Sequence, residues 1–112
     1  MTSLTNYKVE GTSLFDKQIK RLSKKYPSLK FEYRTLIESL VKNPIQGSSL
    51  GNNCYKIRLS VSSKGKGKSG GARVITYIHF TQYKVFLLSI YDKSEQQDIT
   101  HRDLKNWIAL LI

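Results

Sequence analysis

The segment that decides the fold is residues 54–80, CYKIRLSVSSKGKGKSGGARVITYIHF. Apolar and polar side chains alternate from Cys54 to Val61, which predicts a β-strand with one buried face and one exposed basic face. Residues from Ala72 to Phe80 predict a second strand. Because neighbouring strands usually pair when the connection is short, we expect both strands to share one sheet. The cations expected on one face of that sheet are Lys56, Arg58 and Arg73.

Two amphipathic helices are expected before this segment. Apolar residues recur at helical spacing from Leu14 to about Tyr26, and again from Leu29 to Val41. Thr12 and Ser13 can cap the first helix, and Ser28 can cap the second. The break at Pro27 suggests that the two helices form an antiparallel hairpin.

The other expected elements either have weaker sequence patterns or follow the two strands along the chain. A short first strand is expected from Asn6 to Glu10, and a loop from Pro44 to Asn53. Lys84 to Tyr91 predicts a third strand of the sheet, which a polar connector, Asp92 to Ile99, follows. Thr100 and Asp103 form the start of a last, short helix. The order predicts a single α+β domain over residues 1–112, in which the helical hairpin packs on one face of a small antiparallel sheet.

The charge distribution favours a polyanionic partner. The chain has 19 basic and 8 acidic residues, a net charge of +11, and no acidic side chain from Ser39 to Tyr91. A field of one sign attracts nucleic acid and speeds its arrival, although excess lysine can also serve solubility alone. Lys64, Lys66 and Lys68 alternate with glycines, so we expect a mobile cationic loop that contacts RNA. Ser62 stands where a nucleotide-binding phosphate loop requires glycine, and the loop precedes a strand rather than a helix.

The composition disfavours several other classes. No apolar run reaches the length of about 20 residues that a membrane-spanning helix needs, and the polar N-terminus does not resemble a secretory signal. A single cysteine, Cys54, forms no internal disulfide, which suits the reducing cytoplasm. We expect no metal and no cofactor, and we interpret Asp92, Glu95 and Asp98 as solvated surface rather than as a magnesium site.

Three motifs, taken in order, resemble the RelE/ParE superfamily of toxins: CYKIRL (54–59), ARV (72–74) and SIYDKSE (89–95). The segments LSKKYPS (22–28) and GKSGGARV (67–74), with Asn43, Pro44 and Gly47, resemble the HigB-like branch. The similarity extends from about Thr12 to Thr100.

The resemblance implies a bacterial toxin that is paired with an antitoxin. It also implies the RelE-like, microbial ribonuclease-like fold and metal-independent cleavage of messenger RNA in the ribosomal A site of the 30S subunit. The expected antitoxin is a HigA-like helix-turn-helix protein.

The resemblance also implies roles for particular residues. Arg73 would bind the scissile phosphate, because a guanidinium can contact two oxygens at once. In the family pattern two basic residues on one strand carry the chemistry, and they correspond to Lys56 and Arg58. We expect neighbouring cations to lower the pKa of Lys56, which would suit it to proton transfer. Lys93 matches the basic residue after the last strand. A tyrosine of the family is replaced by Ile99, so Tyr91 or Tyr77 would stack a base or move a proton.

Two other functions remain open at this point. A ParE-like toxin of the same fold would inhibit DNA gyrase without nuclease chemistry. A non-catalytic basic module would bind RNA or DNA, which explains the charge but not the order of the motifs.

Overall fold

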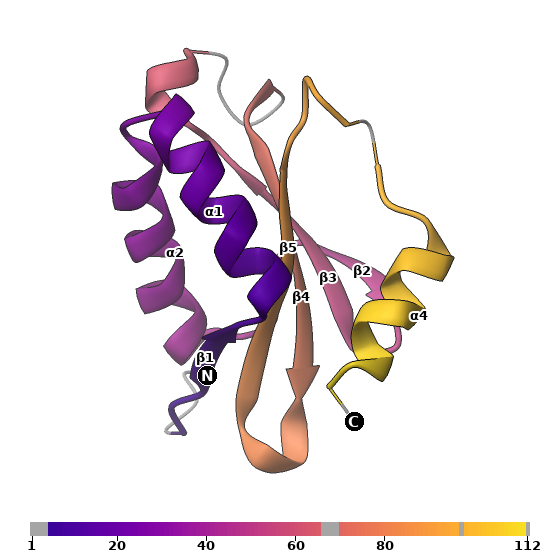
Figure 1. The fold of residues 1–112 in the computed structure, drawn as a ribbon. Helices are drawn as coiled ribbons and strands as arrows, with labels where there is room; N and C mark the ends of the chain where they lie inside the picture. The colour runs from indigo at the N-terminus through magenta and orange to yellow at the C-terminus, as the bar shows by residue number, and fades with distance from the viewer. Residues whose placement is uncertain (1–4, 66–69, 97, 112) are drawn as a thin grey trace.

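The computed structural model describes residues 5–65, 70–96 and 98–111. Helices α1 and α2 cover one face of a central sheet, and helix α4 lies against the other face (Figure 1). The helices are α1 (Ser13–Lys25), α2 (Leu29–Lys42) and α4 (His101–Ala109). The strands are β1 (Lys8–Gly11), β2 (Ser48–Gly51), β3 (Cys54–Leu59), β4 (Ala72–His79) and β5 (Lys84–Asp92). The predicted α+β class, with an N-terminal helical hairpin and a short C-terminal helix, is confirmed.

The sheet has five strands in the order β1-β5-β4-β3-β2. The predicted antiparallel meander is confirmed for β3, β4 and β5. Strand β1 pairs with β5 in parallel, which the sequence pattern did not indicate. The prediction of a loop from Pro44 to Asn53 is wrong in part, because strand β2 pairs with β3 there. Its sequence, SSLG, has little strand propensity, so this strand depends on the backbone ladder that β3 offers.

The helix starts show how local sequence sets the element boundaries. The Thr12 hydroxyl accepts a hydrogen bond from the Phe15 amide at 3.2 Å, so α1 is capped as expected. Ser28 precedes α2 but makes no capping bond with its side chain; its hydroxyl instead donates to Glu32 at 3.0 Å. At α4 both bonds of the capping box between Thr100 and Asp103 are present.

Two cores lie on opposite faces of the sheet. The larger one lies under α1 and α2 and includes Phe15, Leu22, Leu40, Val74 and Leu87. The smaller one lies under α4 and includes Cys54, Ile75, Leu88, Tyr91 and Leu104. Helix α4 therefore covers part of the face that also carries the predicted cations.

Among the residues that the structure describes, no helix has both the length and the apolar composition that a membrane span requires.

Candidate functional site

Three strands place a row of side chains across the sheet, on the face opposite α1 and α2. Arg58 of β3 lies directly opposite Arg73 of β4, and Arg73 lies directly opposite Tyr91 of β5. Side chains at such positions share a face, with Cβ atoms about 5 Å apart. Lys56 precedes Arg58 by two residues on β3, so it lies on the same face. The structure thus brings together four of the residues singled out in the sequence.

The three cations differ in accessibility. Arg58 is exposed, and the side chain of Lys56 is 26% exposed. Arg73 is only 5% exposed, and its Nη1 donates a hydrogen bond to the Ala72 carbonyl at 3.2 Å. Arg73 lies in the middle of the row, with Arg58 on one side and Tyr91 on the other. A substrate on this face would therefore meet Arg58 and Lys56 first.

A carboxylate that the sequence reading set aside belongs to this face. Lys56 Nζ lies 3.4 Å from Asp98 Oδ1. A hydrogen bond from the Ile99 amide and the charges of Lys56 and Lys93 hold the pKa of Asp98 below its ordinary value. Asp98 is exposed as expected, with 60% of its side chain accessible, but it also pairs with Lys56, so Lys56 does not face like charges alone. The only indication in the sequence was that acidic residues reappear directly after the long cationic stretch.

Tyr91 is covered by the smaller core and is 4% exposed. Burial is the main cause that raises the pKa of its hydroxyl; Asp98 raises it further, and Arg73 opposes the shift. Within the described part of the chain the hydroxyl makes no hydrogen bond of normal geometry. In this structure Tyr91 forms the buried end of the row and does not face solvent.

Lys93 directly follows β5, at the end of the sheet where β4 begins. Its backbone amide donates to the Gly71 carbonyl at 3.0 Å, just before β4 begins. Its charge is the smallest of the causes that lower the pKa of Asp98. Lys93 therefore lies close to the row, although it belongs to no strand.

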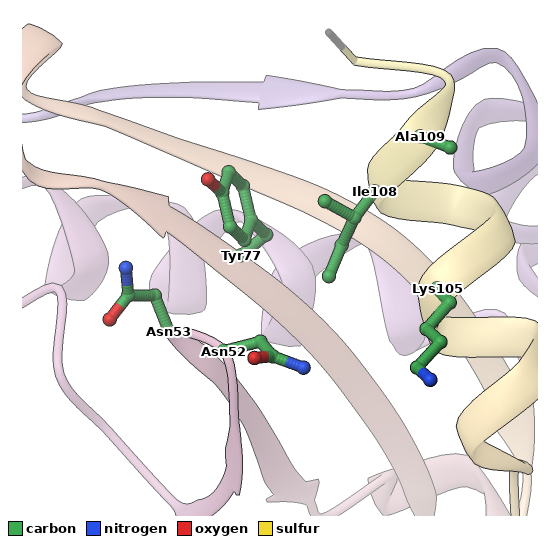
Figure 2. A pocket seen from close by; sticks show the side chains of 6 residues that line it. All are labelled: Asn52, Asn53, Tyr77, Lys105, Ile108 and Ala109. Atoms are coloured by element: carbon green, nitrogen blue, oxygen red, sulfur yellow. The ribbon is translucent and has the colours of Figure 1, made fainter.

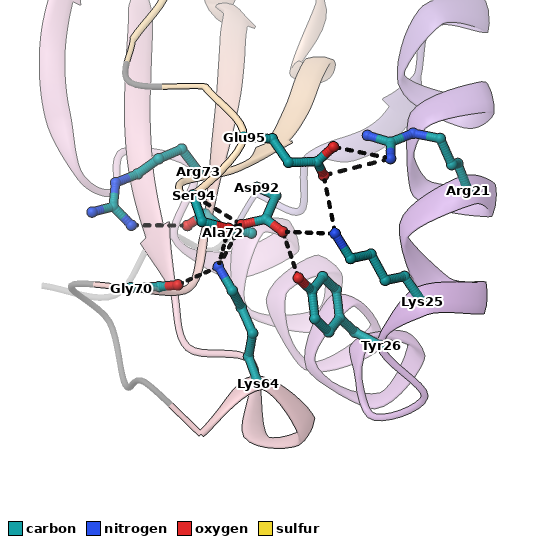
Figure 3. A network of polar contacts seen from close by, with 10 residues as sticks. All are labelled: Arg21, Lys25, Tyr26, Lys64, Gly70, Ala72, Arg73, Asp92, Ser94 and Glu95. Atoms are coloured by element: carbon teal, nitrogen blue, oxygen red, sulfur yellow. Dashed lines mark hydrogen bonds and ion pairs between the residues drawn. The ribbon is translucent and has the colours of Figure 1, made fainter.

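A buried ion pair anchors the segment that precedes Arg73 (Figure 3). Lys64 Nζ contacts Asp92 Oδ1 and donates to the Gly70 carbonyl at 2.5 Å. The side chain of Lys64 is 7% exposed and that of Asp92 is fully buried. The expectation that Asp92 is solvated surface is wrong. Lys64 also does not project as a loop cation, so its expected contact with RNA has no support in the geometry.

Asp92 is held by several donors besides Lys64. It accepts hydrogen bonds from the Tyr26 hydroxyl at 2.6 Å and from the Ser94 amide at 2.9 Å. Burial alone would raise the pKa of this carboxyl, but the bonds from Lys64, Tyr26 and Ser94 outweigh burial and hold its pKa well below the ordinary range. At the rim, Lys25 Nζ lies 3.8 Å from Asp92 Oδ2. Asp92 is therefore a charged structural group rather than a proton donor.

The polar contacts around Asp92 hold the backbone segments that carry the cation row. Asp92 lies directly opposite Ala72, the residue before Arg73. The Ser94 amide bonded to Asp92 turns the chain after β5, toward the connector that carries Asp98. One buried carboxylate thus ties together the start of β4, the end of β5 and the connector.

The other predicted RNA contacts lie elsewhere. Lys66 and Lys68 fall outside the described residues. Tyr77 shares a face of β4 with Arg73 but lies four residues further along the strand, where its ring stacks on Phe86 at a centroid distance of 6.3 Å. It lines a separate cavity of about 470 Å³ (Figure 2). Tyr77 is therefore not part of the row.

Among the described residues, no group of three or more histidine, cysteine, aspartate or glutamate side chains is placed to hold a metal ion.

Comparison with known proteins gives consistent results. A family model described as the RelE toxin of the RelE/RelB toxin–antitoxin system matches residues 13–110. The chain is similar in structure to an arginine-to-alanine double mutant of the Escherichia coli toxin RelE in the free state, with a TM-score of 0.64 and 14% identity over 96% of this chain and 100% of that one. It is also similar to isolated E. coli RelE, with a TM-score of 0.55 and 20% identity over 95% and 99% of the two chains. A third match is to the Mycobacterium tuberculosis toxin–antitoxin complex RelBE2, with a TM-score of 0.55 and 12% identity over 82% and 97%.

Proposed function

Because this chain belongs to the RelE toxin family of toxin–antitoxin systems, we propose that it is an endoribonuclease that cuts messenger RNA on the ribosome. The observation that supports this proposal is the row of Arg58 and Arg73 beside Lys56, on a sheet face that α1 and α2 leave uncovered. Three cations on one small surface repel one another, and a phosphodiester relieves that repulsion. Gyrase inhibition has no need of such a cluster.

The proposed reaction uses the RNA itself as nucleophile. The 2′-hydroxyl attacks the adjacent phosphorus and loses its proton, while the bond to the 5′-oxygen breaks and that oxygen takes up a proton. The products are a 2′,3′-cyclic phosphate and a 5′-hydroxyl. In the transition state negative charge builds up on the phosphate oxygens, so fixed cations stabilise it more than the substrate.

The structure suggests how the cations divide this task. Arg58 is exposed and contacts the phosphate directly. Arg73 lies one strand further in on the same face, and it adds positive charge at a site where burial weakens solvent screening. Lys56 transfers a proton, and Asp98 holds its ammonium group in place. Lys93 follows β5 two residues after Tyr91 and is our candidate for the side of the leaving group.

The test is primer extension on translated messenger RNA with purified wild-type and variant toxins. We expect Arg58→Ala to lower the cleavage rate about 10²-fold or more, a typical loss when one stabilising donor is removed. Arg34→Ala is the matched control, because Arg34 is exposed on α2, away from the row, and its loss should change the rate less than twofold. Cleavage should also disappear when ribosomes are omitted.

Two results would contradict the proposal. Equal cleavage by Arg58→Ala, Arg73→Ala and the control would remove the cation row from the mechanism. Intact messenger RNA together with inhibited DNA supercoiling would favour the ParE-like function instead.

The partner of this toxin is an antitoxin, as the family implies. We propose further that the chain belongs to the HigB-like branch, that its antitoxin is a HigA-like helix-turn-helix protein, and that both act in the cytoplasm. A net charge of +11 favours an acidic antitoxin segment over the cationic face. Co-purification of the toxin with the product of a neighbouring small reading frame would test this.

A further inference from the structure

The cavity beside Tyr77 lies on the same side of the sheet as the cation row, and the proposed chemistry does not use it. It has a volume of about 470 Å³ and lies between the β2–β3 turn, strand β4 and helix α4 (Figure 2). Its lining residues are Asn52, Asn53, Tyr77, Lys105, Ile108 and Ala109.

The β2–β3 turn carries two asparagine side chains that line the cavity. Gly51 pairs with Cys54, so Asn52 and Asn53 alone form the turn, and both have left-handed backbones with φ of 52° and 61°. Asparagine suits such a turn for its backbone alone, so its presence does not by itself indicate a ligand. However, the Asn53 carbonyl accepts a hydrogen bond from the Ile78 amide at 2.9 Å, which anchors the turn to β4. Neither side-chain amide has a hydrogen-bond partner among the described residues, so both can bind an external donor or acceptor.

Tyr77 supplies an aromatic surface beside these amides. Its ring is half-buried and stacks on the ring of Phe86, with an angle of 27° between the two planes. Phe86 thus holds the ring in place from one side. A ring that is fixed in this way can stack on a nucleobase without losing side-chain freedom.

The cavity carries positive charge and lacks a carboxylate. Lys105 is exposed on α4 at the rim, and it makes no ion pair within the described ranges of the chain. No aspartate or glutamate lines the cavity. An anionic group next to a base would therefore be attracted rather than repelled.

The distance between the cation row and the Tyr77 cavity is short enough for one RNA strand to reach both. Tyr77 follows Arg73 by four residues on β4, which corresponds to about 13 Å along the strand. A smaller cavity lined by Leu50, Asp98 and Leu104 lies on the same face and includes the carboxylate that contacts Lys56. The cavity at Tyr77 is thus within reach of nucleotides close to the scissile phosphate.

We infer that the Tyr77 cavity binds an unstacked nucleobase of single-stranded RNA, with Lys105 on a neighbouring phosphate, and that it contributes to base preference near the cut. The inference rests on the proposed function only for the cleavage step, because binding can be measured without any cleavage.

The first test is an NMR titration of ¹⁵N-labelled toxin with AMP, GMP, CMP and UMP, each compared with ribose 5-phosphate. We expect saturable shifts of the Asn52 and Asn53 side-chain amides with at least one nucleotide, and weaker shifts with ribose 5-phosphate. Equal shifts with ribose 5-phosphate would indicate a phosphate site alone, and they would overturn the inference. Shifts that map only to other surfaces would also overturn it.

The variants are chosen so that the fold is kept. Glycine tolerates left-handed backbone, so Asn52→Gly combined with Asn53→Gly removes both amides and retains the turn. This variant and Tyr77→Leu should each weaken nucleotide binding at least tenfold, whereas Tyr77→Phe, which keeps the ring, should bind nearly normally. Phe31→Leu is the control, because Phe31 is an exposed aromatic residue on α2. Loss of binding in the control as well, or unchanged binding in Tyr77→Leu, would contradict the inference.

A second assay separates this inference from the proposed function. In primer extension, the double glycine variant should still cut messenger RNA but should change its base preference at one position near the cut. Unchanged preference together with normal cleavage would refute the subsite and leave the nuclease proposal intact. Absence of cleavage in the wild-type protein would refute the nuclease proposal, while the NMR result would still decide on the subsite.

Discussion

Replacement of Lys64 by methionine should destabilise the protein strongly, although a lysine in a glycine-rich loop is normally expendable. The change keeps the length of the side chain and removes only the ammonium group. That group contacts Asp92 and donates to the Gly70 carbonyl, and the Asp92 side chain has no exposed surface. Lys64→Met would therefore leave a buried carboxylate without its cation.

The magnitude follows from the remaining donors. Removing one partner of a buried ion pair typically costs about 3–5 kcal/mol. Asp92 keeps its bonds from the Tyr26 hydroxyl and from the Ser94 amide and hydroxyl, at 2.6, 2.9 and 2.7 Å. We therefore expect the lower end, about 3 kcal/mol, in the free energy of unfolding. Urea unfolding at pH 7 measures this value, with an unchanged m-value as evidence that the denatured state is the same.

The pH dependence provides a second measurement. The folded-state pKa of Asp92 is lower than its unfolded value, so this group stabilises the fold above about pH 4, and that stabilisation is lost as the pH falls toward the folded value. In Lys64→Met one principal cause of the lowered pKa is gone. The loss of stability between pH 5 and pH 3 should therefore be smaller than in the wild type.

Two comparisons make this reasoning refutable. Lys17→Met changes an exposed lysine on α1 and should alter stability by less than about 0.5 kcal/mol. Adding Asp92→Asn to Lys64→Met should cost less than the sum of the two single changes, because both remove the same interaction. If Lys64→Met behaves like Lys17→Met, or if the two changes are additive, the buried pair does not anchor this edge of the sheet.

Three further predictions concern single positions. Gly47 has a left-handed backbone with φ of +86°, and a Cβ there would collide with the Lys56 carbonyl. Gly47→Ala should therefore lower the free energy of unfolding, measured by chemical denaturation, by about 2–4 kcal/mol. Gly65→Ala is the control, because Gly65 has φ of +73° with open space around it, and it should cost about 1 kcal/mol. Burial raises the pKa of the Cys54 thiol to about 11, so a thiol reagent at pH 8 should label the unfolded protein quickly and the native protein hardly at all; fast labelling of the native protein would contradict this. Thr100→Ala removes one bond of the capping box of α4 and should lower the free energy of unfolding by about 1 kcal/mol, while Thr100→Ser should have little effect.

Much of the fold could be predicted because it depends on local patterns. Alternation in β3, the strand composition of β4, helical spacing in α1 and α2, and the caps at Thr12 and Thr100 act over a few residues, and all of them are confirmed. Strand β2 was missed because its serines and glycine carry no apolar pattern, and it is held by backbone bonds to β3. The parallel pairing of β1 with β5 was missed because it joins residues that are 76 positions apart.

The candidate site shows the same division. Alternation along β3 and the hairpin connection to β4 were sufficient to place Lys56, Arg58 and Arg73 on one face. Their accessibility was not predictable, because it depends on which elements lie over the sheet. Asp98 was missed because its contact with Lys56 spans 42 residues and requires the turn after β5.

By itself, the amino-acid order determined where helices α1, α2 and α4 and strands β3, β4 and β5 form, how the basic side chains alternate on β3, and that the chain carries a strong positive field. Only the tertiary structure decided what each charge does: Lys64 became a buried partner of Asp92, whereas Arg58 stayed exposed at the surface. The physical reason is that strand and helix patterns arise from neighbouring residues, but desolvation and ion pairing depend on groups that meet only after the chain has folded.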